Sequence, residues 1–226
     1  MTRRALISEL VDAISHVHRP HPIRIAIDGV DAAGKTTLAD ELVEPLEQLD
    51  REVIRASMDG FHNPATLCYQ KGDPSPEGYF RDSFNLAALI DSLLAPLGPR
   101  GNRQYRRTFF DHRLDATLEC SVDKATQRAV LLFDGVFLLR DELRPFWDFS
   151  IFVRASFEVA VARAELRDRE FACDEAGVRR RYVERYVPGQ RLYFAEARPE
   201  RRADFVVDND DPERPSIVSH GRALRA

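Results

Sequence analysis

Residues 29–36 read GVDAAGKT and match the spacing G-x-x-x-x-G-K-[ST] of a phosphate-binding loop. The glycines let backbone N–H groups turn toward phosphate oxygens, and a helix that begins there adds the partial positive charge of its N-terminus. Lys35 can reach the outer phosphates, and the Thr36 hydroxyl can bind Mg²⁺. The alternative is a glycine-rich turn between a strand and a helix. The residues of this segment that we predict to contact a nucleotide are Gly29, Val30, Asp31, Ala32, Ala33, Gly34, Lys35, Thr36 and Thr37.

Two carboxylates are expected near this loop because each follows a predicted strand. Asp59 comes just after the strand at 52–57, and Asp134 ends the apolar run at 129–133. The C-terminal ends of parallel strands share one edge of a sheet, and ligands bind outside that edge. Thr36, Asp59 and Asp134 are therefore candidate ligands of Mg²⁺, and Asp59 is also a candidate acceptor for the proton of an attacking hydroxyl. For each aspartate the alternative is a turn residue before the glycine that follows it.

The elements that must position these groups alternate between strands and helices. A right-handed crossover makes the first two strands parallel, and Pro45 is expected to kink or shorten the helix between them. The pattern predicts one α/β domain with a mainly parallel sheet of about five strands. The tail after Asp211 is expected to be loosely held. Strands are predicted at 23–28, 52–57, 129–135, 149–153 and 203–207, and helices at 3–18, 36–49, 84–95, 156–169 and 175–197.

The composition narrows the classes of partner. The 226 residues carry a formal net charge of −4, which argues against a bulk attraction to nucleic acid or to an anionic membrane. The three cysteines are far apart and form no C-x-x-C pair, as expected of reduced thiols in a cytoplasmic protein. Residues 1–17 contain acidic residues within their apolar pattern, so we predict neither a signal peptide nor a membrane span there.

The sequence resembles the uridine kinase and phosphoribulokinase-like branch of the P-loop kinases over about residues 23–207. The resemblance implies a P-loop NTPase fold of three layers, α/β/α, with a helical lid. It also implies transfer of the γ-phosphoryl group of ATP, with Mg²⁺, to a primary hydroxyl. In that family the acid of the segment that corresponds to MDGFH is the general base, here Asp59. The acid of the segment that corresponds to LLFDGVFLL lies on the metal side, here Asp134. The segments are GVDAAGKTT at 29–37, MDGFH at 58–62, LLFDGVFLL at 131–139, RAELRDRE at 163–170 and the stretch 186–209.

The resemblance divides the predicted domain, residues 1–226, into functional parts. These are an N-terminal helix at 1–20, an acceptor-binding insert at 60–113, and the lid with its following helix at 160–200. Arg163 and Arg167 share one face of the lid helix, where guanidinium groups can contact the nucleotide and neutralise the transferring phosphoryl group. Arg167 joins Asp59 and Lys35 as a predicted catalytic residue, and Asn209 is predicted to lie at the edge of the adenine. Arg179, Arg180, Arg181 and Arg185 are expected on a solvated helical face.

The acceptor-binding residues are expected in the insert. His62 follows Asp59 by one turn and can bind an acceptor hydroxyl, and Tyr79 and Phe84 can stack on a flat base. The stretch QYRRTFFDHR combines aromatic and polar groups as a nucleoside clamp would. The alternatives are a loop histidine, aromatic packing beneath a long loop, and a solvated hairpin. The predicted substrate-binding residues are Asp59, His62, Tyr79, Phe84, Tyr105, Asp111 and His112.

The acceptor is less well defined than the chemistry. Uridine kinases usually have tyrosine where this chain has His62, and the carboxylate that they place on the ribose hydroxyls has no equivalent near Tyr79. We therefore predict an ATP- and Mg²⁺-dependent small-molecule kinase whose first candidate acceptor is a nucleoside. A sugar, a sugar phosphate or a pantothenate-like alcohol is the alternative acceptor. A nucleotide-dependent regulatory switch is the alternative class, although no N-K-x-D segment is present, and a homo-oligomer remains open.

Overall fold

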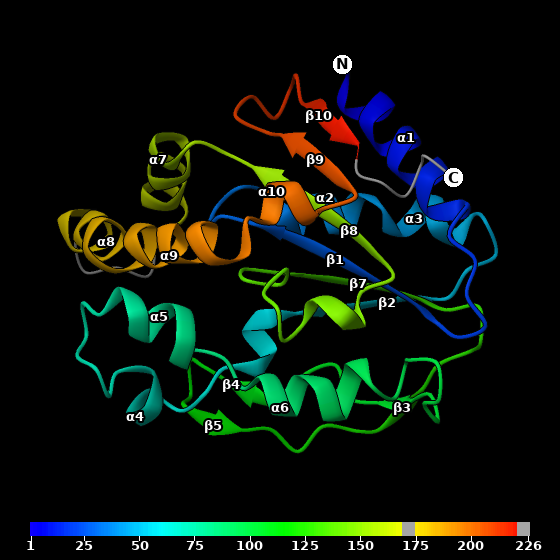
Figure 1. Ribbon diagram of the computed structural model, residues 1–226, viewed down its shortest axis with the longest axis horizontal. Coiled ribbons are helices and arrows are strands. Elements are labelled where there is room, and N and C mark those ends of the chain that lie inside the picture. Colours follow the sequence, from blue (N-terminus) through cyan, green and yellow to red (C-terminus); the bar gives the residue numbers. More distant parts are fainter. Residues whose placement is uncertain (169–174, 221–226) are drawn as a thin grey trace.

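A six-stranded sheet forms the centre of the computed structural model, which describes residues 1–168 and 175–220 (Figure 1). The strands lie in the order β10-β9-β8-β1-β7-β2, so that β1 is flanked by β7 and β8. Pairing is parallel from β2 through to β9, which confirms the predicted α/β class with five parallel strands. The strands are β1 Ile23–Gly29, β2 Val53–Ser57, β7 Val130–Gly135, β8 Phe149–Arg154, β9 Phe205–Asp208 and β10 Ser216–His220.

The sixth strand corrects the prediction of a loosely held tail. Ser216 pairs with Asp208 and Ile217 with Val207, so β10 runs antiparallel to β9 at the edge of the sheet. Its sequence gives a weak signal because the segment SIVSH is short and has only two adjacent apolar residues. Contact with the neighbouring strand, rather than local preference, orders this segment.

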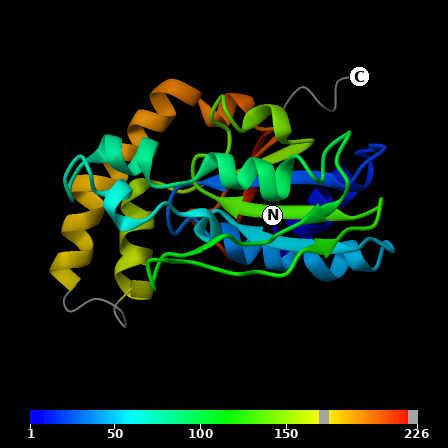
Figure 2. The ribbon, with the colours of Figure 1, turned by 90° about the horizontal axis from the view of Figure 1, so that it is seen from below.

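Alternate residues of the central strands point to two separate cores. On one face Ile25 and Ile27 pack with residues of the first helices, and on the other Ala26 packs with the helices that follow β2 and β8. Figure 2 shows this layering, with the green helix α6 and the blue helices α2 and α3 on opposite sides of the strands. The sheet is thus buried on both faces, as the continuous apolar strands predict.

The helices follow the predicted order, with breaks at identifiable residues. Pro45 lies in α3, and its ring would clash with the carbonyl of residue 41, where α2 ends. A π-helical segment at Tyr182–Tyr186 leads directly into α9, so Pro188 stands in the first turn of that helix and does not break the path. The helices are α1 Arg3–Ser15, α2 Lys35–Glu41, α3 Val43–Glu47, α6 Leu86–Leu89 with the π-helical segment Ile90–Leu94, α7 Phe157–Asp168, α8 Glu175–Arg181, α9 Val187–Ala197 and α10 Pro199–Arg202.

Residues 58–124 form a layer below the sheet in the view of Figure 1. It contains short helices and two small antiparallel pairs of strands, of which the pair at 110–117 is a hairpin. None of the described helices combines the length and the apolar character needed to cross a bilayer. The elements of this layer are the 3₁₀ turn Met58–Phe61, α4 Ala65–Cys68, α5 Pro76–Asp82, β3 Gln104–Tyr105 paired with β6 Asp123–Lys124, and β4 Phe110–Asp111 paired with β5 Ala116–Thr117.

Candidate active site

The predicted phosphate-binding loop connects β1 to α2, with Gly34 in the left-handed conformation at the start of the helix (φ 91°). Gly29 approaches β8 so closely that a Cβ there would lie 2.2 Å from the carbonyl oxygen of Val153, so a larger residue would displace the loop. Lys35 is buried, and its Nζ donates to the carbonyl of Val30 at 2.7 Å. The Lys35 ammonium group therefore lies against the backbone of the phosphate-binding loop. In loops of this kind the backbone N–H groups can bind phosphate oxygens.

Thr36 and Asp134, two of the predicted metal ligands, are in contact. The Thr36 hydroxyl donates to Oδ2 of the buried Asp134 at 2.6 Å. Arg55 on β2 donates from Nη2 to the other oxygen, Oδ1, at 3.0 Å. A hydroxyl beside a carboxylate is a hard-oxygen donor set of the kind that Mg²⁺ binds together with substrate phosphates. Among the described residues no group of three or more acidic, histidine or cysteine side chains could hold a metal. The contact between Thr36 and Asp134 itself fits a site in which substrate phosphates and water complete the ligands of Mg²⁺.

Asp59 lies in the 3₁₀ turn that follows β2, and its side chain is 72% exposed. Ser57, the last residue of β2, pairs with Asp134, and β7 pairs in parallel with β1, so Asp59 follows the edge of the sheet that also carries the phosphate-binding loop. An exposed carboxylate beside that loop can accept a proton from a hydroxyl that approaches from solvent. No contact joins Asp59 to Thr36 or Asp134 in the described structure, so its role as a metal ligand stays a prediction.

Three predicted acceptor residues form a cluster beside Asp59. The ring of His62 lies 4.6 Å from that of Phe84 and 5.0 Å from that of His112, measured between centroids. Nε2 of His62 is 4.0 Å from Oδ1 of Asp59. Burial, with a smaller contribution from His112, lowers the pKa of His62 to about 4. His62 is therefore neutral at pH 7 and can offer a hydrogen bond to an acceptor without adding charge.

Arg163 and Arg167 lie on α7, and residues 169–174 of the predicted lid segment are outside the described residues, so their contacts with a nucleotide stay a prediction. Nη2 of Arg163 donates to the carbonyls of Asn209 and Asp210 at 2.9 and 3.0 Å. Nη2 of Arg167 is 3.2 Å from the Tyr182 hydroxyl, and its charge lowers the pKa of Asp31. The Arg167 guanidinium thus lies within electrostatic range of the phosphate-binding loop.

The geometry can now be compared with known proteins. No family model matches the chain. Uridine-cytidine kinase B of Dictyostelium discoideum is 26% identical over 152 residues, which cover 67% of this chain and 60% of the relative's own length. A possible uridine kinase from Bacillus stearothermophilus superposes with a TM-score of 0.69 at 24% identity, covering 90% of this chain and 97% of that one.

Two sugar-related kinases superpose as well. A proposed fructose transport system kinase from Silicibacter sp. TM1040 gives a TM-score of 0.70 at 21% identity, covering 87% of this chain and 96% of that one. D-glycerate 3-kinase from Cryptococcus neoformans gives 0.59 at 13% identity, covering 95% and 96%. The chain has the fold of a P-loop kinase. Together the matches support the resemblance to the uridine kinase and phosphoribulokinase-like kinases.

Asn209 supports the phosphate-binding loop through a side-chain hydrogen bond. Its Nδ2 donates to the carbonyl of Ala33 at 2.7 Å, and its Oδ1 accepts from Nη1 of Arg3 at 3.0 Å. The side chain is 3% exposed, so both ends of the amide are already engaged. The structure therefore assigns Asn209 to the loop itself and corrects its predicted contact with a base.

Three aromatic residues of the predicted acceptor site, Tyr79, Tyr105 and Phe84, are buried and offer no surface on which a base could stack, and a fourth residue, Asp111, is engaged by its own turn. Tyr79 is buried, and its ring packs against Phe137 at 5.0 Å. Tyr105 is 1% exposed and lies in the core below the sheet. Asp111 accepts from two backbone N–H groups of its own turn, which lowers the pKa of its carboxyl. Phe84 is buried, and its ring packs against His62. The buried aromatic residues therefore follow the alternative of packing beneath the loop and do not form a surface for stacking on a base.

Arg185 corrects the expectation of a solvated arginine face. The side chain is buried, and it donates from Nη2 to the carbonyl of Cys68 at 3.0 Å and from Nη1 to that of Asp73 at 2.5 Å. Its guanidinium also lies 4.6 Å from the centre of the Tyr69 ring. The segment after the lid is thereby fastened to residues 68–73 of the predicted acceptor insert.

Asp28 is a site residue that the sequence analysis missed. It is fully buried at the end of β1 and accepts from the N–H groups of Gly29 at 2.8 Å and Leu139 at 3.2 Å and from the Tyr193 hydroxyl. Burial raises its pKa to about 6, although the Tyr193 hydrogen bond opposes the shift. An acid inside the apolar segment IAIDG was the available signal.

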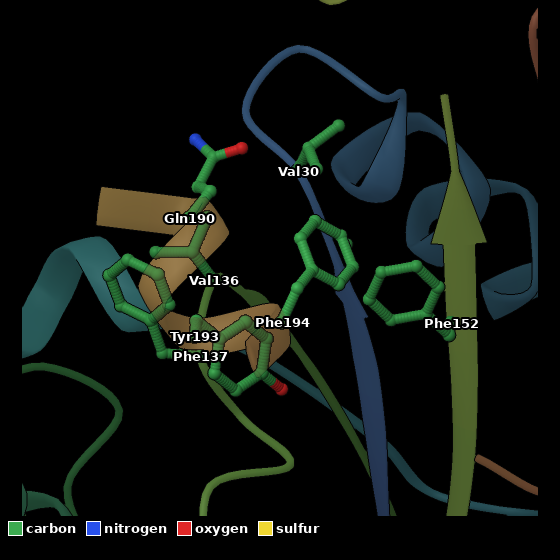
Figure 3. Close-up of a pocket in the computed structure, with 8 residues that line it drawn as sticks. Val30, Val136, Phe137, Phe152, Gln190, Tyr193 and Phe194 are labelled. Atoms are coloured by element: carbon green, nitrogen blue, oxygen red, sulfur yellow. The ribbon is translucent and has the colours of Figure 1, made fainter. Parts of the chain in front are cut away.

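Around this network lies an apolar crevice formed by the end of β1, the segment after β7 and helix α9. Figure 3 shows that Val30, Tyr193 and Phe194 line it, and it has no room for a water molecule. The crevice is therefore part of the packing beneath the loop and is not a ligand pocket. Asp28 and Tyr193 consequently join α9 to the base of the phosphate-binding loop.

The raised pKa of Asp28 predicts a pH-dependent contribution to stability. The folded protein keeps this proton up to about pH 6, whereas the unfolded chain releases it near pH 3.8, so stability is lost as the pH rises through that window. Relative to Asp28→Asn, which does not titrate, the free energy of unfolding of the wild type should fall by about 2–3 kcal/mol between pH 4 and pH 7. Urea unfolding of both proteins at a series of pH values measures this difference. A difference that is independent of pH would contradict the assignment.

Proposed function

We propose that this P-loop kinase transfers the γ-phosphoryl group of ATP, with Mg²⁺, to a primary hydroxyl of a small molecule. A nucleoside such as uridine or cytidine is the first candidate acceptor. The observation that carries the proposal is the contact of Thr36 in the phosphate-binding loop with Asp134, on the sheet edge that also holds Asp59. A metal-side carboxylate and a separate, exposed carboxylate are what phosphoryl transfer to an alcohol requires.

Each group has a distinct task in this proposal. Lys35 and the backbone N–H groups of the loop bind the phosphates, and Thr36 and Asp134 hold the Mg²⁺ that neutralises charge on them. Asp59 accepts the proton of the attacking hydroxyl, and the neutral His62 orients that hydroxyl. Arg167, whose charge reaches Asp31, stabilises charge on the transferring group.

One observation favours a second candidate acceptor, a sugar or a sugar acid. Tyr79, Phe84 and Tyr105, the aromatic residues expected to stack on a base, are all buried. The partly exposed His62 beside Asp59 and the exposed His112 that contacts it are instead polar, as a polyol would need. Two of the structurally similar proteins are described as fructose- and glycerate-related kinases, which agrees with this alternative.

A panel of acceptors distinguishes the candidates. ADP release is measured with ATP and Mg²⁺ in the presence of uridine, cytidine, fructose, D-glycerate or pantothenate, and products are identified by mass spectrometry. Turnover stimulated by an alcohol, with a product heavier by one phosphoryl group, supports the kinase proposal. Slow ATP hydrolysis that no alcohol stimulates would favour a nucleotide-dependent regulatory protein instead.

The metal-side assignment makes a separate prediction. Asp134→Asn should raise the Mg²⁺ concentration needed for half-maximal activity by about 10- to 100-fold, because a neutral amide binds the cation more weakly. Asp40→Asn is the matched control, since Asp40 pairs with the same Arg55 but is largely exposed. A Mg²⁺ titration of steady-state activity measures both variants. An unchanged requirement in Asp134→Asn would remove this residue from the metal site.

A further inference from the structure

Asp31, in the phosphate-binding loop, is held by two elements that lie far from it in the sequence. Its Oδ2 accepts from the hydroxyl of Tyr79, on α5, at 2.7 Å and from Nε2 of Gln190, on α9, at 2.5 Å. Both donors are themselves buried, at 7% and 3% exposure. The carboxylate is thus fixed in orientation at the junction of the loop, the insert and the helix after the lid.

The other oxygen of this carboxylate, Oδ1, has no hydrogen-bond donor among the described residues. Asp31 is partly buried, and Oδ1 is not a fully enclosed atom, since the only fully enclosed side-chain oxygen without a partner in the described part of the chain is Oδ2 of Asp82. A carboxylate with one oxygen fixed and the other accessible is a preorganised hydrogen-bond acceptor.

Asp31 and Asp59 lie at the same edge of the sheet. Asp31 is in the loop after β1 and Asp59 is in the turn after β2, and both strands pair in parallel with β7. Burial raises the pKa of the Asp31 carboxyl, with a smaller contribution from Asp59, while Lys35 and Arg167 lower it. An acceptor whose hydroxyl reaches Asp59 therefore binds at the edge that also holds Asp31.

A carboxylate at this position is unfavourable for binding a polyphosphate, because it places a negative charge in the loop that cradles phosphates. Structural support alone does not need that charge, since a neutral amide oxygen could accept from Tyr79 and Gln190 equally well. A hydroxyl donated by the acceptor gains more from a charged oxygen than from a neutral one. The charge is thus explained by recognition of the acceptor.

We propose that Asp31 determines acceptor specificity by accepting, through Oδ1, a hydrogen bond from a second hydroxyl of the acceptor that is not phosphorylated. Polyols such as a ribose or a sugar acid are then preferred over alcohols with a single hydroxyl. The inference rests on the proposed kinase function and adds a substrate-contacting role for Asp31. Tyr79 and Gln190 are positioning residues that act through this carboxylate.

The test compares acceptors that differ by one hydroxyl. For uridine, 2′-deoxyuridine and 3′-deoxyuridine, or for the best sugar of the panel and its mono-deoxy forms, kcat/KM is measured in the wild type and in Asp31→Asn. In the wild type one deoxy analogue should be poorer than the parent by about 10- to 100-fold, as expected for loss of a hydrogen bond to a charged group. In Asp31→Asn the same ratio should fall to about 3-fold or less.

Two further variants separate recognition from support. Tyr79→Phe keeps the ring but removes one of the two donors to Asp31. The ratio of kcat/KM for the parent acceptor to that for the deoxy acceptor should therefore decrease by about 3- to 10-fold. This variant tests the inference independently of whether Asp31→Asn folds. Asp50→Asn makes the same charge change on a side chain that is 93% exposed and should leave the ratio unchanged. Melting temperatures identify variants that are folded.

The outcomes are distinct. A drop in activity that is equal for parent and deoxy acceptors in the folded variants would show that Asp31 only supports the loop, and the inference would be wrong. A wild type that discriminates against neither deoxy form would overturn it as well, with the kinase proposal intact. If no alcohol is phosphorylated at all, the proposed function fails and this inference fails with it.

Discussion

Replacing Asp59 by asparagine should lower the turnover number by about 10²- to 10⁴-fold, the range expected for loss of a general base. The amide keeps the size of the side chain but cannot take the proton of the attacking hydroxyl. Because Asp59 is 72% exposed and does not contact the phosphate-binding loop, the affinity for ATP should stay nearly unchanged. Steady-state kinetics with saturating acceptor, together with calorimetric titration of ATP, measure the two quantities separately.

Asp91→Asn provides the comparison for this variant. Asp91 is an exposed aspartate of the same layer below the sheet, so its replacement changes the net charge equally without touching the site. It should retain the turnover number of the wild type. Near-normal turnover in Asp59→Asn would contradict the assignment of Asp59 as the general base. It would favour the alternative that Asp59 is a turn residue, and the proposed reaction would then lack a base.

Replacing Lys35 by alanine should reduce kcat/KM for ATP by about 10²- to 10³-fold, the loss typical of a preorganised charged donor in the transition state. Unlike Asp59→Asn, this variant should also bind ATP more weakly, since the ammonium lies within the loop, on the carbonyl of Val30. Lys35 also lowers the pKa of the buried Asp28 and of the partly buried Asp31, so its removal leaves both carboxyls less well compensated.

Lys124→Ala is the control, because Lys124 lies exposed on the β6 strand, away from the loop. In Lys35→Ala, both the ATP affinity measured by titration and the turnover number measured at saturating ATP should decrease. In Lys124→Ala, neither quantity should change. If Lys35→Ala lost turnover while binding ATP normally, the lysine would act only on the transferring phosphoryl group and not in nucleotide binding.

The parts of the fold that the sequence predicted are those specified by local patterns. The central strand β7 comes from the unbroken apolar run AVLLF at 129–133, and the other parallel strands come from short segments rich in Ile, Val and Phe. The juxtaposition of Thr36 and Asp134 also followed from sequence, because strand order and a right-handed crossover bring the ends of β1 and β7 to one edge.

The parts that could not be predicted depend on contacts between distant segments. Arg55 reaches Asp134 only because β2 pairs with β7, and Arg185 is buried only because the insert folds back over it. Tyr79 differs from its prediction for the same reason. Its hydroxyl donates to Asp31, 48 positions away, and its ring is buried in the core and does not face a base. Spacing along the chain contains no information on such pairs.

The buried guanidinium of Arg185 has a mechanical consequence. It joins the π-helical segment beyond the lid to the backbone of residues 68–73, so a rotation of one must displace the other. In the proposed kinase, binding of the acceptor to the insert should accordingly change the rate at which ADP is released.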